Sequence, residues 1–200
     1  MKALLWIGGI FLVLLLLVVG SFNGMATGRN AVNASFGVYH SQLQRRADLI
    51  PNLVATVRGY AEHEERVFTE VTEARARASQ LLQLDPNQLA SSPELQRQLL
   101  DAQNTLSGAL SRLMVVVEAY PQLQSSERFG QLQAQLEGTE NRIAVARRDT
   151  QLAIQTYNNR IQTLPGVLFA GMFGFEPFAF YEATAPNAEQ APTVDFSTTP

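Results

Sequence analysis

The chain has 200 residues, of which 46% are hydrophobic and 16% are charged, and its net charge is −3. Without a basic excess, the sequence does not favour nucleic-acid binding. No cysteine is present, which excludes disulfides, thiolate metal sites and cysteine nucleophiles. The length suits one domain with one additional segment.

The N-terminal segment predicts a membrane anchor. Residues 3–28 carry no charge, and residues 3–20 are almost wholly apolar. As a helix, residues 3–20 are roughly 27 Å long, close to the ~30 Å hydrocarbon core of a bilayer. The alternative is a signal peptide cut near Ser21, although this apolar run is longer than a usual signal core. Lys2 before the span and Arg29 after it leave the side of the membrane undecided, with a slight preference for an extracytoplasmic bundle.

The next region predicts one long helix, roughly residues 28–84. Apolar residues recur there at alternating spacings of four and three, interrupted by Arg46 and Glu64. The apolar positions are Val32, Phe36, Tyr39, Leu43, Ile50, Leu53, Val57, Tyr60, Val67, Val71, Ala74, Ala78 and Leu81. A 3.5-residue repeat is typical of helices with coiled-coil-like packing. No turn residues precede Pro51, so we expect it to kink the helix without breaking it. Asp85-Pro86-Asn87 is expected to form the terminating turn.

Two further helices are predicted. The first begins at Ser92-Pro93 and ends before Pro121, and the second begins at Ser125 or Ser126 and ends at Leu164. The expected inward positions are Leu95, Leu99, Ala102, Leu106, Ala109, Leu113, Val116 and Tyr120 in one, and Phe129, Leu132, Leu136, Ile143, Ala146, Ala153 and Tyr157 in the other. Short connections make consecutive helices antiparallel. The expected fold is therefore all-α, an N-terminal transmembrane helix followed by an elongated antiparallel up-and-down bundle of three to four long helices.

Four segments follow from this pattern. We predict an anchor at residues 1–27, a helical bundle at 28–164, a Phe/Gly-rich apolar segment at 165–183 and an extended or disordered tail at 184–200. Glycines and Glu176-Pro177 interrupt the Phe/Gly-rich segment too early for a spanning helix. Two interpretations stay open for it: it folds back to cap the bundle, or it stays exposed to contact lipid or a partner.

The polar clusters do not predict catalysis. Glu62-His63-Glu64-Glu65 lacks the second histidine of a zinc site, and His40 lies far back along the helix. Glu137 and Glu140 form a carboxylate pair, but no nucleophile with its base, phosphate loop or metal shell accompanies them. We therefore expect no catalytic, cofactor-binding or metal-ligating residue. Arg46 and Glu64 are expected to fix helix register, and the mid-helix Gly138 is expected to mark close packing.

Several segments closely resemble the bacterial LemA family. They are "QLQRRADLIPNLVATVRGYAEHE" at 42–64, "ALSRLMVVVEAYPQL" at 109–123, "LEGTENRIAVARRD" at 136–149, "YNNRIQTLPGVLFAGMFGF" at 157–175 and "APTVDF" at 191–196. The resemblance implies an N-terminal membrane segment, an elongated antiparallel bundle and no established enzymatic activity. One branch of the family is tied to forming magnetosome membranes, which implies a role in membrane organisation. Family descriptions often place the bundle inside the cell, whereas Lys2 mildly favours the opposite.

Two functions are expected from these observations. The first is a non-enzymatic scaffold, anchored in the cell membrane by a single span, whose long helices pair with copies of itself or with a partner. The second is an accessory subunit of a membrane enzyme such as a protease. Membrane lipid and a homo-oligomeric or membrane-protein partner are the expected contacts; no cofactor, nucleic acid or small-molecule substrate is expected.

Overall fold

The computed structural model describes residues 2–179. The predicted tail at 184–200 and residues 180–183 of the Phe/Gly-rich segment lie outside the described residues. The described part contains helices and turns without a strand, in the order α1 (Lys2–Arg58), α2 (Glu65–Leu82), α3 (Pro86–Ser91), α4 (Pro93–Glu118), α5 (Pro121–Gln124), α6 (Glu127–Gln162) and α7 (Gly166–Phe169). The predicted all-α class is confirmed.

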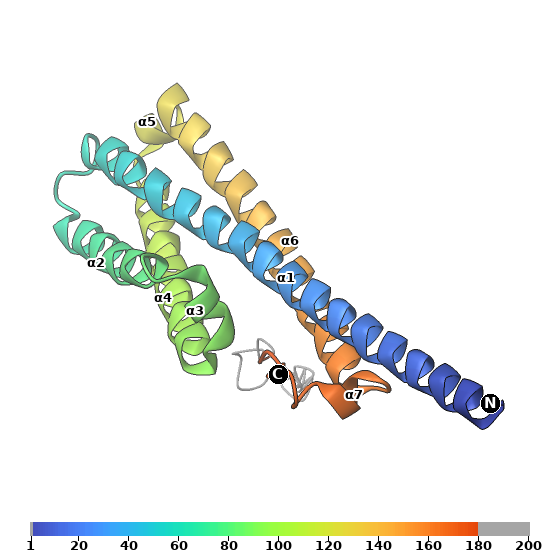
Figure 1. Cartoon of the computed structure of the whole chain (residues 1–200). Helices are drawn as coiled ribbons and strands as arrows, with labels where there is room; N and C mark the ends of the chain where they lie inside the picture. The colour runs from blue at the N-terminus through green and yellow to red at the C-terminus, as the bar shows by residue number, and fades with distance from the viewer. Residues whose placement is uncertain (1, 180–200) are drawn as a thin grey trace, which may run out of the picture.

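Four long helices, α1, α2, α4 and α6, make an elongated antiparallel bundle (Figure 1). Helix α1 packs along α6 and also contacts α2, while α2 packs along α4. The N-terminal part of α1 projects beyond the other helices (Figure 1). The predicted anchor and bundle are therefore parts of one helix, which continues unbroken across residues 27 and 28.

The prediction of a single helix over residues 28–84 is wrong. Helix α1 ends at Arg58, and a turn over residues 59–64 reverses the chain into α2. The sequence signal for this end is Gly59, because glycine is common just after a helix C-terminus. The amide of Tyr60 closes the last turn on the carbonyl of Val57. The 3.5-residue repeat does not reveal this turn, because apolar residues resume nearly in phase beyond it.

The exposure of side chains around this turn shows where the repeat fails. Tyr60 is exposed and Glu64 is half-buried at the start of α2, whereas Ala61 and Phe68 enter the core instead. Glu64 therefore does not fix helix register as expected. The inward positions expected before the turn are buried, including Arg46.

The starts of the later helices follow their capping signals. The hydroxyl of Ser92 accepts a hydrogen bond from the amide of Leu95, with Pro93 at the first helical position, and α6 begins directly after Ser126. Asp85 likewise accepts from the amide of Asn87. The predicted turn at Asp85-Pro86-Asn87 is therefore the capped start of the short helix α3.

Pro51 lies inside α1, as predicted, and a neighbouring helix compensates for its missing amide. An interior proline leaves the carbonyl four residues earlier without its usual donor, which here is the carbonyl of Ala47. The guanidinium Nε of Arg75 on α2 donates to this oxygen at 2.7 Å. Because Ala47 is buried, this hydrogen bond prevents an unsatisfied polar group in the core.

We expect Pro51→Ala to leave the bundle folded and to raise its melting temperature, because a helix-interior proline costs about 3 kcal/mol. Arg75→Ala should cost about 1–3 kcal/mol alone, since it strands the Ala47 carbonyl. Arg75→Ala should cost less in the Pro51→Ala background, because the backbone amide at position 51 can then donate to the Ala47 carbonyl. Thermal unfolding of the four variants measures this coupling, with Arg77→Ala, exposed on the same helix, as the control. An equal cost of Arg75→Ala in both backgrounds would contradict the compensation.

Candidate functional site

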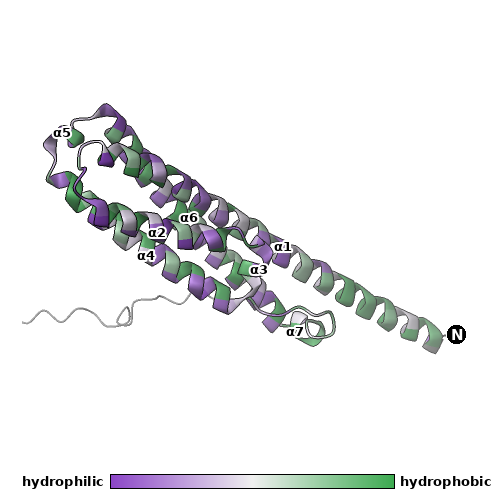
Figure 2. Ribbon diagram, turned by 90° about the vertical axis from the view of Figure 1, so that its left-hand side faces the viewer, coloured by the Kyte–Doolittle hydropathy of each residue, from purple (hydrophilic) through white to green (hydrophobic). Residues whose placement is uncertain are grey.

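The N-terminal part of α1 exposes a continuous apolar surface. Its large apolar side chains from Leu4 to Val19 are mostly about half exposed or more, and none of them is buried. Figure 2 shows the residues of this part as almost uniformly hydrophobic, whereas hydrophilic and hydrophobic residues alternate along the helices of the bundle. One helix of the described chain is long and apolar enough to cross a membrane, and it is this one.

Beside the base of this apolar part lies a compact segment, residues 163–175, which includes α7 and is called the foot below. Gly166, Ala170 and Phe175 of the foot are buried, and Phe22 of α1 makes edge-to-face contacts with Phe173 and Phe175. Leu164, Leu168 and Met172, by contrast, are strongly exposed. One set of side chains in the Phe/Gly-rich segment therefore packs against the end of the bundle, and another set faces outward; contact of the outward set with lipid or a partner stays a prediction.

The C-terminal end of α6 holds the chain that follows the foot. The hydroxyl of Tyr157 donates to the carbonyl of Glu176 at 3.0 Å. The Asn158 side-chain amide donates to the carbonyl of Phe178 at 2.8 Å and accepts from its backbone amide at 3.0 Å. Burial raises the pKa of Tyr157 above its ordinary value of 10, opposed by the positive charge of Arg29, so the phenol stays a donor at neutral pH. These bonds fix the chain directly after the foot against the bundle.

Close backbone contacts complete this end of the molecule. The guanidinium of Arg160 donates to the carbonyl of Gly24 on α1 at 2.7 Å. A Cβ atom on Gly166 would collide with the carbonyl oxygen of Arg160, so only glycine fits where the chain turns back from α6. Gly138, in contrast, meets its own helix neighbour Arg142 at ordinary distance, and the expectation of close packing there is wrong.

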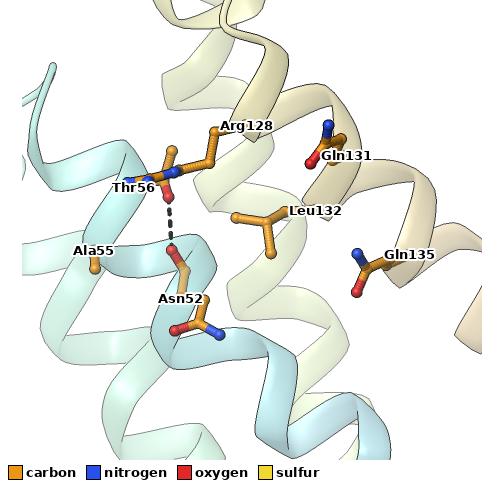
Figure 3. A pocket seen from close by; sticks show the side chains of 7 residues that line it. All are labelled: Asn52, Ala55, Thr56, Arg128, Gln131, Leu132 and Gln135. Carbon is orange, nitrogen blue, oxygen red and sulfur yellow. Dashed lines mark hydrogen bonds between the residues drawn. The ribbon is translucent and has the colours of Figure 1, made fainter.

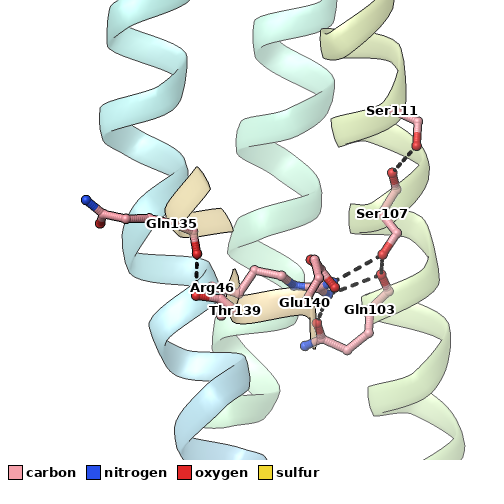
Figure 4. A network of polar contacts seen from close by, with 7 residues as sticks. All are labelled: Arg46, Gln103, Ser107, Ser111, Gln135, Thr139 and Glu140. Atoms are coloured by element: carbon pink, nitrogen blue, oxygen red, sulfur yellow. Dashed lines mark hydrogen bonds and ion pairs between the residues drawn. The ribbon is translucent and has the colours of Figure 1, made fainter. Parts of the chain in front are cut away.

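A polar layer crosses the middle of the bundle (Figure 4). Arg46 of α1 is 3% exposed, and its guanidinium forms an ion pair with Glu140 of α6 at 2.9 Å. It also donates to the hydroxyl of Ser107 at 3.2 Å and to the side-chain oxygen of Gln103, both on α4. Three helices are therefore joined by one side chain.

This polar layer separates two apolar cores. On α1 the lower core ends at Leu43 and the upper core begins at Ile50, and on α4 Leu100 and Leu106 lie on either side of Gln103. Within residues 2–179, Arg46 Nε and Gln103 Nε2 are buried without a hydrogen-bond partner. The layer is therefore costly to bury, which is consistent with a role in register, as expected for Arg46.

Of the other polar residues considered for catalysis, Glu137 and Glu140 lie together, in a groove that also contains Ser107 and Ser111. His40 lies against the carbonyl of Leu82 at 2.9 Å, at the end of α2, whereas His63 is exposed in the turn after α1. Glu140 pairs with Arg46, while Glu137 accepts from Gln133 on its own helix. Among residues 2–179, no group of three or more histidine, aspartate or glutamate side chains is placed to hold a metal ion.

A groove of about 350 Å³ lies between α1 and α6 near the far end of the bundle (Figure 3). Its lining is Asn52, Ala55, Thr56, Arg128, Gln131, Leu132 and Gln135. The hydroxyl of Thr56 already donates to the carbonyl of Asn52 at 2.8 Å. Of these side chains only Arg128 carries a charge, so the groove offers hydrogen bonding but no acid–base pair.

Comparison with known proteins identifies the family of this chain. The LemA family matches residues 36–196, which is most of the chain. The chain belongs to the LemA family. The resemblance seen in the sequence is thereby confirmed, and its segments coincide with the structural features above: Arg46 and Glu140 of the polar layer, and Gly166 of the foot, lie within them.

The similar LemA-family proteins include magnetosome proteins. Magnetosome proteins MamQ 2 and MamQ 1 of Paramagnetospirillum magneticum are each 29% identical over 177 residues, covering 80% of this chain and 64% of the relative. Magnetosome protein MamQ of Magnetospirillum gryphiswaldense is 26% identical over 185 residues, covering 86% of this chain and 67% of the relative. The chain thus spans less than two thirds of MamQ 2 and MamQ 1.

For the polar layer, we expect Arg46→Ala to destabilise the bundle by about 1–3 kcal/mol. Breaking a fully buried pair costs about 3–5 kcal/mol, but the Glu140 side chain is 43% exposed, so water can solvate it and the loss is smaller. Denaturant unfolding measures this, with the exposed neighbour Arg45→Ala as the control. Equal stability of the two variants would contradict an energetic role for the layer.

For the foot, Gly166→Ala should lower the melting temperature markedly, because the added Cβ displaces the chain from the Arg160 carbonyl. Gly171→Ala should leave the melting temperature nearly unchanged, since nothing lies within 4 Å of a Cβ added there. Thermal unfolding of both variants makes the comparison. If both melted like the unmodified chain, the close turn at Gly166 would be refuted.

Proposed function

We propose that this LemA-family protein is a non-catalytic membrane scaffold. Its α1 anchors the chain in the cell membrane through residues 3–20, and the bundle organises the membrane or a membrane complex by pairing with further copies of itself. Family membership and the magnetosome-protein relatives support a membrane-associated, non-enzymatic role. The side of the membrane on which the bundle lies is left open by Lys2 and Arg29.

The observation that carries this proposal is the continuity of α1. Its apolar part and its core-forming part belong to one helix, Lys2–Arg58, without an intervening linker. A rigid connection of this kind transmits the position of the bundle directly to the bilayer, and it suits a spacer or scaffold better than a tethered catalytic domain. The groove between α1 and α6 contains Arg128 among amides, hydroxyls and apolar side chains. The groove that contains Glu137 and Glu140 is otherwise lined by serines, one glutamine and apolar side chains, and its Glu140 is paired with Arg46.

The test begins with native membranes carrying the tagged full chain. We expect the protein to stay in the membrane pellet after carbonate washing and to retain its N-terminus, because an apolar span leaves the bilayer only at great cost. Extraction and affinity purification should then give a homo-oligomer. Cross-linking and mass measurement in detergent determine the subunit number.

Other results would overturn parts of the proposal. A chain beginning near Ser21 in the soluble fraction would show that residues 3–20 are a cleaved signal peptide. A stoichiometric membrane enzyme in the purified complex, such as a protease, would replace the scaffold by an accessory subunit. A peripheral protein attached only by charge should be released by high salt, which is the control wash.

A further inference from the structure

We propose that the foot inserts Leu164, Leu168 and Met172 into the bilayer beside α1, as a second membrane contact that seats the bundle on the lipid surface. This inference deepens the proposed function, because it requires α1 to be an anchor. It assigns a lipid-binding role to residues 163–175, which follow the last long helix and lie far from the anchor in sequence.

The exposed side of the foot is strongly apolar. Leu164 and Met172 are each 75% exposed and Leu168 is 64% exposed, although other apolar residues of the same segment are buried. No charged residue occurs between Arg160 and Glu176. Apolar side chains arranged outward on an uncharged segment are typical of a surface that meets another apolar phase.

The level of the foot along α1 matches the membrane boundary. Residues 163–166 and α1 line a common groove of about 440 Å³. The α1 residues that line it are Leu16, Leu17, Gly20, Ser21 and Gly24. If residues 3–20 span the hydrocarbon core, Leu16 lies roughly 6 Å inside its edge at 1.5 Å per residue. Gly24 lies roughly 6 Å outside the same edge, so this groove crosses the membrane boundary, and its deepest part is within the depth of about 5–10 Å to which interfacial segments insert their apolar face.

The backbone of the foot is suited to a layer with little water. The amides of Val167, Ala170 and Phe175 donate to carbonyls of Thr163, Gly166 and Ala170, at 2.8–2.9 Å. Irregular backbone is tolerated at membrane depth only where its polar groups are satisfied within the protein.

The nearest positive charges are Arg160, bonded to the Gly24 carbonyl, and the exposed Arg29. Both lie beyond the apolar edge, where lipid headgroups are found.

Lipid is the occupant that this geometry favours. Leu164 of the foot lines the same groove as Leu16 and Leu17 of α1, whose exposed apolar surface a bilayer already covers if α1 is an anchor. Exposed apolar residues of the bundle, such as Val115 and Leu152, lie among polar neighbours away from this surface. Insertion of α1 into the bilayer therefore also places the exposed side of the foot in lipid.

The absence of native cysteine permits a direct test in the full chain. Single-cysteine variants Leu168→Cys and Met172→Cys are labelled with an environment-sensitive nitrobenzoxadiazole probe and reconstituted in phosphatidylcholine–phosphatidylglycerol vesicles. Both probes should show blue-shifted emission, quenching by spin-labelled lipid and protection from aqueous iodide. Val115→Cys and Leu152→Cys, also exposed apolar positions, are the matched controls and should be quenched by iodide alone. Circular dichroism checks that each variant is folded.

Leu12→Cys in the middle of the apolar part separates the two proposals. Quenching of the Leu12 probe by lipid, with probes at Leu168 and Met172 quenched only by iodide, overturns the foot and leaves the anchor intact. A Leu12 probe in water overturns the anchor and the foot together. Probes at the foot that neither quencher reaches indicate a protein contact there, such as a second copy of the chain, and also overturn the lipid assignment.

Discussion

The buried guanidinium of Arg46 is the constraint on which the rest of the bundle depends. A charge removed from water must be paired, and its partners come from α4 and α6, so these helices are held at one height against α1. Apolar cores alone tolerate sliding, because leucine and alanine positions repeat along each helix. The buried donors Arg46 Nε and Gln103 Nε2, which have no partner, make this layer costly in stability.

Register fixed in the middle of the molecule has consequences at its membrane-proximal end. With α1 and α6 held at one height, Arg160 reaches the Gly24 carbonyl and Tyr157 packs opposite Gly28. The chain then turns at Gly166, where a side chain would collide with the carbonyl of Arg160. The foot consequently lies at the level of Leu16 to Gly24 of α1. A shift of α6 by one helical turn, about 5.4 Å, would move it by the same amount along the membrane normal.

The sequence indicated some of these residues and concealed others. Arg46 was visible as a charge in an apolar series, and Pro51 as an interior proline. Their partners Glu140, Gln103 and Arg75 lie on other helices, and nothing in the sequence indicates these pairings. The turn after Arg58 was missed because the 3.5-residue repeat persists nearly in phase beyond it, and Gly59 is a weak signal because it is one of thirteen glycines in the chain. Tyr157 was expected in the core, but its hydrogen bond to Glu176 depends on how the chain returns after Gly166.

The sequence by itself determined the all-α class, the apolar N-terminal segment, the cap at Ser92, the start of α6 to within Ser125 or Ser126, and the family, since each depends on periodicity, composition or residues close together in the chain. The tertiary structure decided where α1 ends, which helices pair, what compensates Pro51, and which side chains of the Phe/Gly-rich segment are covered. Those outcomes depend on contacts between residues far apart in sequence. Whether a phenylalanine or leucine of the Phe/Gly-rich segment is buried depends on the helix that packs against it, and the neighbouring residues in the sequence do not indicate which helix that is.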